Sequence, residues 1–326
     1  MAKITVLGAG GWGMALALVA HSKNHIVNIW SPFEDEVVGL LEKRTNERLL
    51  KGIYLNENIG VTTDINIAKG SDITIIAVPS VAVKSTCETL AAVEDTGITV
   101  NVAKGFEGDS GRLLSDVIKS VLSDRELVVL SGPSHAEEVA RSLPTTVTAA
   151  SDNNESAITV QNLLSTENFR IYTNSDVTGV ELGGALKNVI AVCSGICAGL
   201  GLGDNTRAAM MTRGLNEMTR LGTAMGASEH TFLGLSGIGD LIVTCLSEHS
   251  RNNRFGRLIG NGTPVGEALE SVGTVEGYYA ARHAHNLAKE FSIELPIIEE
   301  CYEILYKEKS PSDAINTLLG RPLRRE

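Results

Sequence analysis

The sequence has no long uninterrupted apolar run. Its uncharged stretches are amphipathic or broken by glycine, and none has the roughly 18 consecutive apolar residues that predict a membrane helix. The N-terminal residues Met1 to Thr5 pass directly into a predicted strand, which leaves no room for a signal peptide. We therefore expect a cytoplasmic protein that is not embedded in a membrane.

Positive charge is scarce. The chain carries 28 Lys and Arg against 39 Asp and Glu, a formal net charge of −11. Because nucleic-acid phosphates are bound by basic surfaces, this excess of acid argues against nucleic acid as a partner. If the ligand is itself an anion, a few cations must form a local positive pocket against the field of the whole chain.

Cysteines are few and lack the spacing of a metal site. The chain has five. Cys193 and Cys197 lie one helical turn apart, but no nearby His or Cys pair completes a site. We expect no metal site and interpret the cysteines as small buried thiols in a reducing compartment.

The chain also lacks a Pro- or Ser-rich linker, a low-complexity tract and an internal repeat. Its 326 residues, 43% of them apolar, are too many for most single cores, which predicts two domains. The sequence pattern changes near residues 175 to 180: runs of β-branched residues end there, and apolar residues begin to recur with a helical period. We predict a dinucleotide-binding domain over 1–178 and a helical, substrate-binding domain over 179–326.

The first domain alternates short β-rich runs with amphipathic stretches. Several runs are continuous Val and Ile, typical of parallel strands buried on both faces. This alternation predicts an α/β fold with a Rossmann-type doubly wound, mostly parallel sheet. The predicted strands are Lys3–Leu7, Ile26–Trp30, Asp72–Val78, Ile98–Val102, Leu127–Ser131, Thr145–Ala150 and Phe169–Thr173, and the predicted helices are Gly11–Ser22, Val81–Leu90 and Gly111–Leu122.

The second domain is predicted to be all-helical, because its apolar residues recur with the 3.6-residue period of helices. The predicted helices are Gly179–Leu200, Ala208–Met225, Tyr279–Lys289 and Pro296–Lys307.

A glycine motif, Gly8-Ala9-Gly10-Gly11-Trp12-Gly13, follows the first strand and opens the first helix. Gly8 permits a tight turn, Gly10 lets a diphosphate approach the backbone, and Gly13 lets helix and strand pack closely. The N–H groups at the helix N-terminus suit the diphosphate of NAD or NADP. Trp12 is either a packing residue or a wall of the cofactor site.

The second strand ends where a dinucleotide-binding fold reads the ribose 2′ position. An acidic residue there favours NAD and a basic one favours NADP. This chain has Trp30-Ser31-Pro32-Phe33-Glu34, with no arginine. Phe33 is suited to stack on the adenine, and Glu34 or Asp35 to reach the ribose. The choice between NAD and NADP stays open, with a slight preference for NAD.

Other strand ends carry candidate ligand groups, because open α/β sheets bind ligands at their carboxyl edge. Pro79 follows one strand, and Lys104 follows the next. After a further strand, Ser134 and Glu137 have the spacing of a capping box, whose backbone N–H groups also suit an anion. A surface lysine without a role is the alternative for Lys104.

The helical domain contains a lysine in an apolar stretch. Lys187 at such a position must find a counter-charge or have its pKa lowered. Gly183 and Gly184, one turn earlier, each cost a helix about 1 kcal/mol, which suggests close approach by another element or a ligand. Ala191, Ser194 and Ala198 share its face, which predicts open space for a small oxygenated substrate.

Asp240 and Thr244 lie four residues apart on one predicted helix face. Asp240 is flanked by apolar residues, and a buried carboxylate needs a cationic partner. Lys187 is the obvious candidate. A purely structural ion pair is the alternative.

A third polar group follows in the helical domain. Arg251 offers planar donors that match a phosphate, and Ser250 and Asn252 add neutral donors. The alternative is a solvated charge run.

These motifs together resemble the bacterial-type NAD(P)-dependent glycerol-3-phosphate dehydrogenases, in the right order over nearly the whole chain. The segments that carry the resemblance are Gly8–Gly13, Val102–Gly105, Ser131–Glu138, Glu181–Asn188, Gly239–Leu241, Ser250–Asn252 and Val275–Gly277.

The resemblance implies roles for single residues. Lys187 would be the general acid and base at the substrate C2 oxygen, supported by Lys104, Asp240 and Thr244. Substrate would be bound by Lys104, Gly132, Ser134, Lys187, Asp240, Ser250, Arg251 and Asn252, with Arg251 and Asn252 on its phosphate. The cofactor-binding residues are Gly8, Gly10, Gly11, Trp12, Gly13, Phe33, Pro79, Lys104, Ala136, Arg251, Val275 and Glu276.

The resemblance also implies a reaction: reversible hydride transfer between NAD(P)H and dihydroxyacetone phosphate, giving sn-glycerol 3-phosphate for glycerophospholipid synthesis. Two positions depart from the family pattern. Gly11 stands where the family often has serine, and Pro32-Phe33 replaces a polar or basic pair.

Two other functions are possible alternatives. One is another two-domain hydroxyacid dehydrogenase, such as a 3-hydroxyacyl or sugar-acid enzyme, against which the Arg251-Asn252 pair argues. The other is a nucleotide-sensing protein without turnover, which would be expected to lack Lys187 or Asp240. The long amphipathic helices are compatible with a homodimer.

Overall fold

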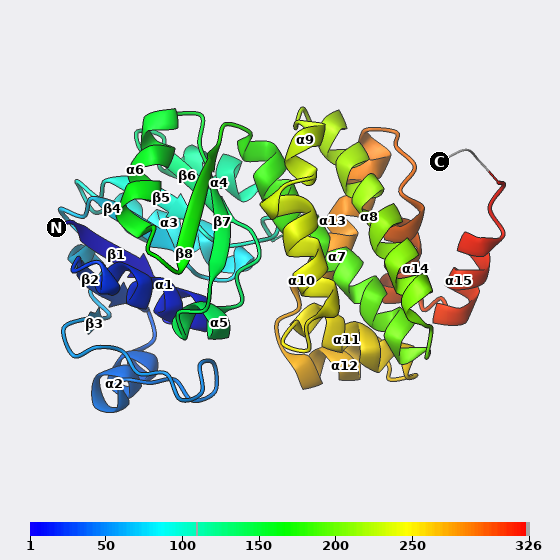
Figure 1. Ribbon diagram of the computed structural model, residues 1–326, viewed down its shortest axis with the longest axis horizontal. Coiled ribbons are helices and arrows are strands. Elements are labelled where there is room, and N and C mark those ends of the chain that lie inside the picture. Colours follow the sequence, from blue (N-terminus) through cyan, green and yellow to red (C-terminus); the bar gives the residue numbers. More distant parts are fainter. Residues whose placement is uncertain (109, 324–326) are drawn as a thin grey trace. The chain divides into compact units, whose positions relative to one another are not determined.

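The computed structural model describes residues 1–108 and 110–323 (Figure 1). Contacts divide the chain into two compact units, Met1–Glu181 and Leu182–Glu326. The border lies inside helix α7 (Val177–Gly199), whereas the sequence placed it after residue 178. The last residues of the predicted second domain, 324–326, lie outside the described residues.

The first unit is built on a single sheet of eight strands in the order β3-β2-β1-β4-β5-β6-β7-β8. All neighbours are parallel except β6 and β7, which are antiparallel, so the mostly parallel Rossmann-type sheet is confirmed. The order reverses between β1 and β4, the switch point beside which such sheets bind ligands. The strands are β1 (Lys3–Leu7), β2 (Ile26–Trp30), β3 (Gly60–Thr62), β4 (Ile73–Ile76), β5 (Ile98–Asn101), β6 (Leu127–Ser131), β7 (Thr145–Ala150) and β8 (Phe169–Asn174).

Helices cover both faces of this sheet. Alternate residues of β1 face opposite ways: Ile4 and Val6 join one core cluster and Leu7 joins another. The first cluster includes side chains of α1 (Gly11–Ser22), α2 (Glu34–Lys43), α5 (Ala136–Ala140) and α6 (Asn154–Leu164), and the second includes those of α3 (Val83–Ala91) and α4 (Leu114–Val121).

Several predicted bounds hold and others do not. β1, β2, β6, β7 and α1 begin and end where the sequence predicted. β4 spans Ile73–Ile76 and is shorter at both ends than the predicted Asp72–Val78. α4 begins at Leu114 rather than Gly111, since Leu113 pairs with Phe106 in an antiparallel bridge. β3, α2 and α6 were not predicted.

The second unit is helical, as predicted. Its elements are the greater part of α7, α8 (Asp204–Ala224), α9 (Glu229–Phe232), the π-helix η3 (Leu235–Gly239), α10 (Asp240–Leu246), α11 (Arg251–Gly260), α12 (Val265–Val272), α13 (Glu276–Glu290), α14 (Pro296–Lys307) and α15 (Pro311–Leu319).

Two helices of this unit meet through glycines. A Cβ added to Gly195 or Gly199 of α7 would overlap the backbone of α11, and one added to Gly256 or Gly260 of α11 would overlap the backbone of α7. The two main chains are therefore in direct contact. This fixes where α11 begins along α7, and so places the side chains at its first turn.

Among the residues that the structure describes, α7 is the one helix whose length and composition would allow it to cross a membrane. The sequence analysis did not predict such a helix. Yet 89% of its apolar window is buried inside the protein, as in the core helix of a globular fold. The segments Glu229–Leu246 and Arg251–Gly260 pass the same test only as a pair, bent by 51°.

Candidate active site

The glycine turn between β1 and α1 has the backbone that the sequence predicted. Gly8 has φ of 123°, a conformation that glycine adopts readily, and a Cβ on it would lie 2.6 Å from the Ala77 carbonyl oxygen. A Cβ on Gly13 would overlap the carbonyl of Gly8. Both glycines are therefore required by the fold itself.

Gly10 differs from these two glycines. A Cβ there would point into space that holds no described atom within 4 Å. Gly10 is the N-cap of α1, with extended backbone, so the first-turn N–H groups of the helix open onto this space. Room for an incoming group beside a helix N-terminus fits the diphosphate of a dinucleotide.

Trp12, beside the glycine turn, packs within the first unit. Its ring lies 6.3 Å from that of Phe169 and contacts the core, while the residue stays half-buried, so a packing role leaves part of its surface for a cofactor. Ala136, the first residue of α5, comes within 3.7 Å of a Cβ placed on Gly11. Ala136 thus lies next to the glycine turn, where a cofactor contact was expected.

Phe33 and Pro79 follow the strands on either side of β1. Phe33 is the N-cap of α2 and 63% exposed, so its ring is available to a ligand. Pro79 is the N-cap of the short 3-10 helix after β4. Strands β2 and β4 both pair with β1, so the two residues and the glycine turn share one edge of the sheet.

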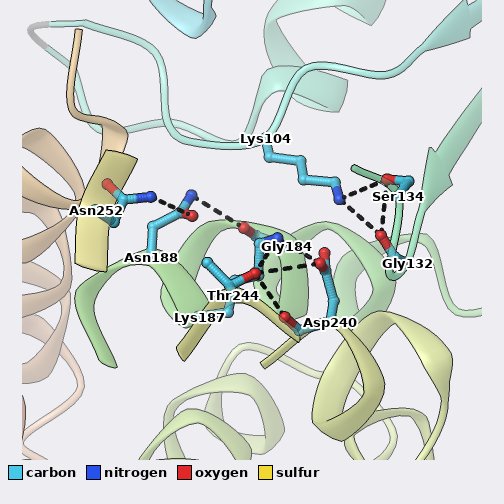
Figure 2. A network of polar contacts seen from close by, with 9 residues as sticks. All are labelled: Lys104, Gly132, Ser134, Gly184, Lys187, Asn188, Asp240, Thr244 and Asn252. Carbon is cyan, nitrogen blue, oxygen red and sulfur yellow. Dashed lines mark hydrogen bonds and ion pairs between the residues drawn. The ribbon is translucent and has the colours of Figure 1, made fainter. Parts of the chain in front are cut away.

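Lys104, Gly132 and Ser134 form one polar cluster in the first unit (Figure 2). The Lys104 amine donates to the Gly132 carbonyl (2.8 Å) and to the Ser134 hydroxyl (3.2 Å). The structure therefore brings together three residues that the sequence placed at the ends of two strands.

The predicted capping box at Ser134 is wrong. Helix α5 begins at Ala136 with His135 as its N-cap, one residue later than a Ser134 cap requires. The Ser134 hydroxyl instead donates to the Gly132 carbonyl (2.9 Å) while it accepts from Lys104.

The second unit holds the buried ion pair that the sequence predicted. The Lys187 amine donates to the carboxylate of Asp240 and to the Thr244 hydroxyl (2.8 Å) (Figure 2). The Thr244 hydroxyl in turn donates to the Asp240 carbonyl (2.6 Å), which sets its lone pairs toward the amine. All three residues are buried. Because Asp240 is anionic, this arrangement favours the ammonium form of Lys187.

Close backbone packing explains how Asp240 reaches Lys187. A Cβ on Gly183 of α7 would overlap the carbonyl of Ser236 in η3, as the sequence suggested for the glycine pair. The π-helix runs directly into α10 and delivers Asp240 one residue after its end. One turn after Gly183, α7 presents Lys187. π-Helical segments are frequent at functional sites.

The predicted open space on this face of α7 is wrong. Ala191 and Ser194 are fully buried, and the Ser194 hydroxyl donates to the carbonyl of Cys245 in α10 (3.1 Å). α10 therefore lies against this face at Ser194, whereas Ala198, one turn further along α7, is half-buried. The small side chains allow α10 to approach rather than leave room for a substrate.

Asn252 is tied to two other helices. Its amide donates to the Asn188 side chain (2.8 Å) and accepts from the Gly277 N–H (2.9 Å), while Asn188 donates to the Gly184 carbonyl (3.3 Å). Asn188, the residue after Lys187, thus couples α7 to α11, and the sequence analysis gave it no role. Its position next to Lys187 was the available signal.

The other predicted residues of the second unit lie at two helix starts. Ser250 is the N-cap of α11, and its hydroxyl accepts from the Asn253 N–H (3.2 Å). Arg251, the first residue of that helix, is exposed. Val275 and Glu276 begin α13, and the bond from Gly277 to Asn252 brings them beside the start of α11.

The sequence analysis gave no role to two buried glutamates. Glu181 accepts from the Ser115 N–H (3.0 Å) and hydroxyl (2.5 Å) at the start of α4. Glu217 accepts from the Ile297 (2.8 Å) and Ile298 (3.0 Å) N–H groups at the start of α14. Each caps a distant helix, and burial raises the pKa of each carboxyl to about 7.

The five cysteines are free and buried. Within 1–108 and 110–323, no group of three or more His, Cys, Asp or Glu side chains is placed to hold a metal ion.

Comparison with known proteins matches both units to one family. Residues 3–157 match the description "NAD-dependent glycerol-3-phosphate dehydrogenase N-terminus", and residues 176–316 match that of the C-terminus. A relative from Fusobacterium nucleatum named glycerol-3-phosphate dehydrogenase [NAD(P)+] is 45% identical, over 100% of this chain and 99% of that protein. A relative of the same name from Syntrophomonas wolfei is 48% identical over 100% and 97%.

A solved structure agrees. The glycerol-3-phosphate dehydrogenase of Coxiella burnetii is 37% identical and superimposes with a TM-score of 0.94, over 98% of this chain and 99% of that one. By sequence and fold, then, the chain belongs to the NAD-dependent glycerol-3-phosphate dehydrogenase family.

Proposed function

We propose that the protein interconverts dihydroxyacetone phosphate and sn-glycerol 3-phosphate with NAD(H) or NADP(H). The observation that carries the proposal is the buried group of Lys187, Asp240 and Thr244 in a chain of this family. A buried lysine with a carboxylate and a hydroxyl is a proton donor held in one orientation.

The first unit is proposed to bind the cofactor. Gly8, Gly10 and Gly13 with the α1 N-terminus would hold the diphosphate, and Phe33 the adenine. Gly11, Trp12, Pro79, Ala136, Lys104, Arg251, Val275 and Glu276 are proposed as the further cofactor contacts. When bound, the nicotinamide supplies the hydride that C2 gains in reduction and accepts it in oxidation.

The proton at the substrate C2 oxygen is assigned to Lys187. In reduction the ammonium donates a proton as the oxygen becomes an alkoxide, and in oxidation the neutral amine removes it. Asp240 stabilises the ammonium, and Thr244 fixes the amine in place. Lys104 is proposed to act on the same oxygen by stabilising its developing negative charge.

The substrate phosphate is assigned to the start of α11. Arg251 is exposed there and has a planar guanidinium that matches phosphate oxygens, and Asn252 is held beside it. Ser250, Gly132 and Ser134 are proposed to add hydrogen bonds to the substrate.

The test is to mix the purified chain with dihydroxyacetone phosphate and NADH or NADPH and follow the loss of nicotinamide absorbance. Turnover that depends on dihydroxyacetone phosphate supports the proposal. Cofactor binding without turnover would favour a nucleotide sensor, and turnover of a hydroxyacyl or sugar-acid substrate alone would favour another dehydrogenase.

We further propose that the protein works in the cytoplasm as a homodimer and supplies sn-glycerol 3-phosphate for glycerophospholipid synthesis. The five free thiols are in keeping with a reducing compartment. Light scattering of the purified chain tests the dimer, and cell fractionation tests the location.

A further inference from the structure

The end of β2 lies beside the glycine turn and is held there firmly. The Gly8 N–H donates to the Trp30 carbonyl (2.8 Å), and Leu7 is paired with Trp30 across the sheet. The Trp30 indole N–H donates to the Thr63 carbonyl (2.9 Å). Ser31, the next residue, is therefore placed where a dinucleotide-binding fold reads the ribose 2′ position.

Ser31 directs a carboxylate to this place. It is buried, and its hydroxyl donates to Glu36 (2.7 Å) while it accepts from the Phe33 N–H (3.3 Å). Glu36 lies in the first turn of α2 and is half-buried, whereas Glu34 and Asp35 of the same turn are exposed. The structure thus selects Glu36, and not Glu34 or Asp35, as the acid turned toward the end of β2.

The segment that follows β2, from Ser31 to Glu36, carries only negative charges. The first turn of α2 carries Glu34, Asp35 and Glu36. The segment from Ser31 to Glu36 contains no Lys or Arg. Arg44, at the far end of α2, donates to the carbonyls of Asn56 and Ile59.

We propose that the Ser31–Glu36 pair makes this protein selective for NAD(H) over NADP(H). A carboxylate accepts hydrogen bonds from ribose hydroxyls, whereas it repels a 2′-phosphate that carries up to two negative charges. The names of the relatives cover both cofactors, so membership of the family does not by itself set the preference. The inference rests on the proposed function, because it assumes that the first unit binds a dinucleotide.

Calorimetric titration of the purified full-length protein with NADH and with NADPH tests the inference without turnover. We expect NADH to bind at least tenfold more tightly. Equal affinities, or tighter binding of NADPH, would overturn the selectivity and leave the proposed function standing. Binding of neither dinucleotide would overturn both.

Variants locate the source of the selectivity. Glu36→Gln should narrow the NADH-to-NADPH affinity ratio several-fold, and Ser31→Arg should narrow it further or reverse it. Glu42→Gln, at the other end of α2, changes the net charge equally and should leave the ratio unchanged. A Glu36→Gln protein that melts at a lower temperature but keeps the ratio would show that Glu36 only supports the helix, and would contradict the proposal.

Discussion

In the first unit, several groups assigned to ligand binding are main-chain atoms, those of the glycine turn and the helix start that follows it. In the second unit, four of the assigned groups are buried side chains. Lys187 is bonded to Asp240 and Thr244, and Asn252 is bonded to Asn188. Truncating a side chain in the second unit strands a buried partner, which costs stability as well as chemistry. In the first unit, binding and folding should be separable.

The largest effect is expected for Lys187→Ala. Turnover should fall by roughly 10³-fold or more because the proton donor is lost. The variant should also lose about 3–5 kcal/mol of unfolding free energy, since the buried Asp240 carboxylate loses its lysine partner. Steady-state kinetics and denaturant unfolding measure the two losses.

A double variant separates these two losses. Lys187→Met combined with Asp240→Leu removes both charges and should recover most of the stability without any turnover. Near-normal turnover in Lys187→Ala would end the assignment of Lys187 as the proton donor.

Lys104→Ala sharpens the contrast between the lysines. Lys104 is only half-buried, so water can replace much of what its removal takes away, and the unfolding free energy should change by less than about 1 kcal/mol. Turnover should still fall by roughly 10²-fold if the amine stabilises charge at the C2 oxygen. A loss of unfolding free energy as large as that of Lys187→Ala would contradict the expected difference between the two units.

Two glycines of the same turn test the separation of binding from folding. Gly10→Ala should weaken dinucleotide binding by roughly tenfold or more at an unchanged melting temperature, because its Cβ would enter the space meant for the diphosphate. Gly13→Ala should instead lose roughly 1–3 kcal/mol of stability, since its Cβ would overlap the Gly8 carbonyl. Calorimetry measures dinucleotide binding by both variants, and thermal melts measure their stability. A Gly10→Ala variant that is destabilised would contradict the separation of binding from folding.

The smallest effect is expected for the two buried glutamates, Glu181 in the first unit and Glu217 in the second. Both units should lose stability in the same way as the pH rises. Each carboxyl has a folded-state pKa of about 7, raised above its unfolded value. The folded state therefore binds more protons, so this contribution to stability is complete below about pH 4.5 and is lost as the pH rises to about 7. As the pH rises from about 6 to about 8, the free energy of unfolding should fall by about 1 kcal/mol for each glutamate.

Glu181→Gln and Glu217→Gln should each flatten the pH dependence of the unfolding free energy by that amount. Denaturant unfolding at the two pH values measures it. An unchanged slope in either variant would mean that the carboxyl concerned does not titrate in this range.

The sequence was sufficient to predict the elements that depend on local pattern. Continuous β-branched runs gave the bounds of β6 and β7, and the glycine motif gave those of α1. β3 was missed because a strand of three residues, Gly60–Thr62, carries too little pattern to detect. The acidic start of α2 carries few apolar residues, so its helical period was not visible.

The same limit applies to the site. Lys187 and Asp240 could be paired from sequence because each is a charge in an apolar stretch and needs the other. Neutral partners leave no such trace: the Asn188–Asn252–Gly277 bonds, and the Lys104 amine that draws Ser134 away from a helix cap, depend on tertiary structure.

The glycine contact between α7 and α11 has a consequence for engineering. Replacing helical glycine by alanine is a common route to thermostability, with a gain of up to about 1 kcal/mol per site. In this protein Gly39 of α2 and Gly266 of α12, where no described atom would lie within 4 Å of an added Cβ, are suitable targets. Gly195, Gly199, Gly256 and Gly260 are not, and a consensus-driven design that treats all helical glycines alike would push α11, with Arg251 and Asn252, away from the helix that carries Lys187.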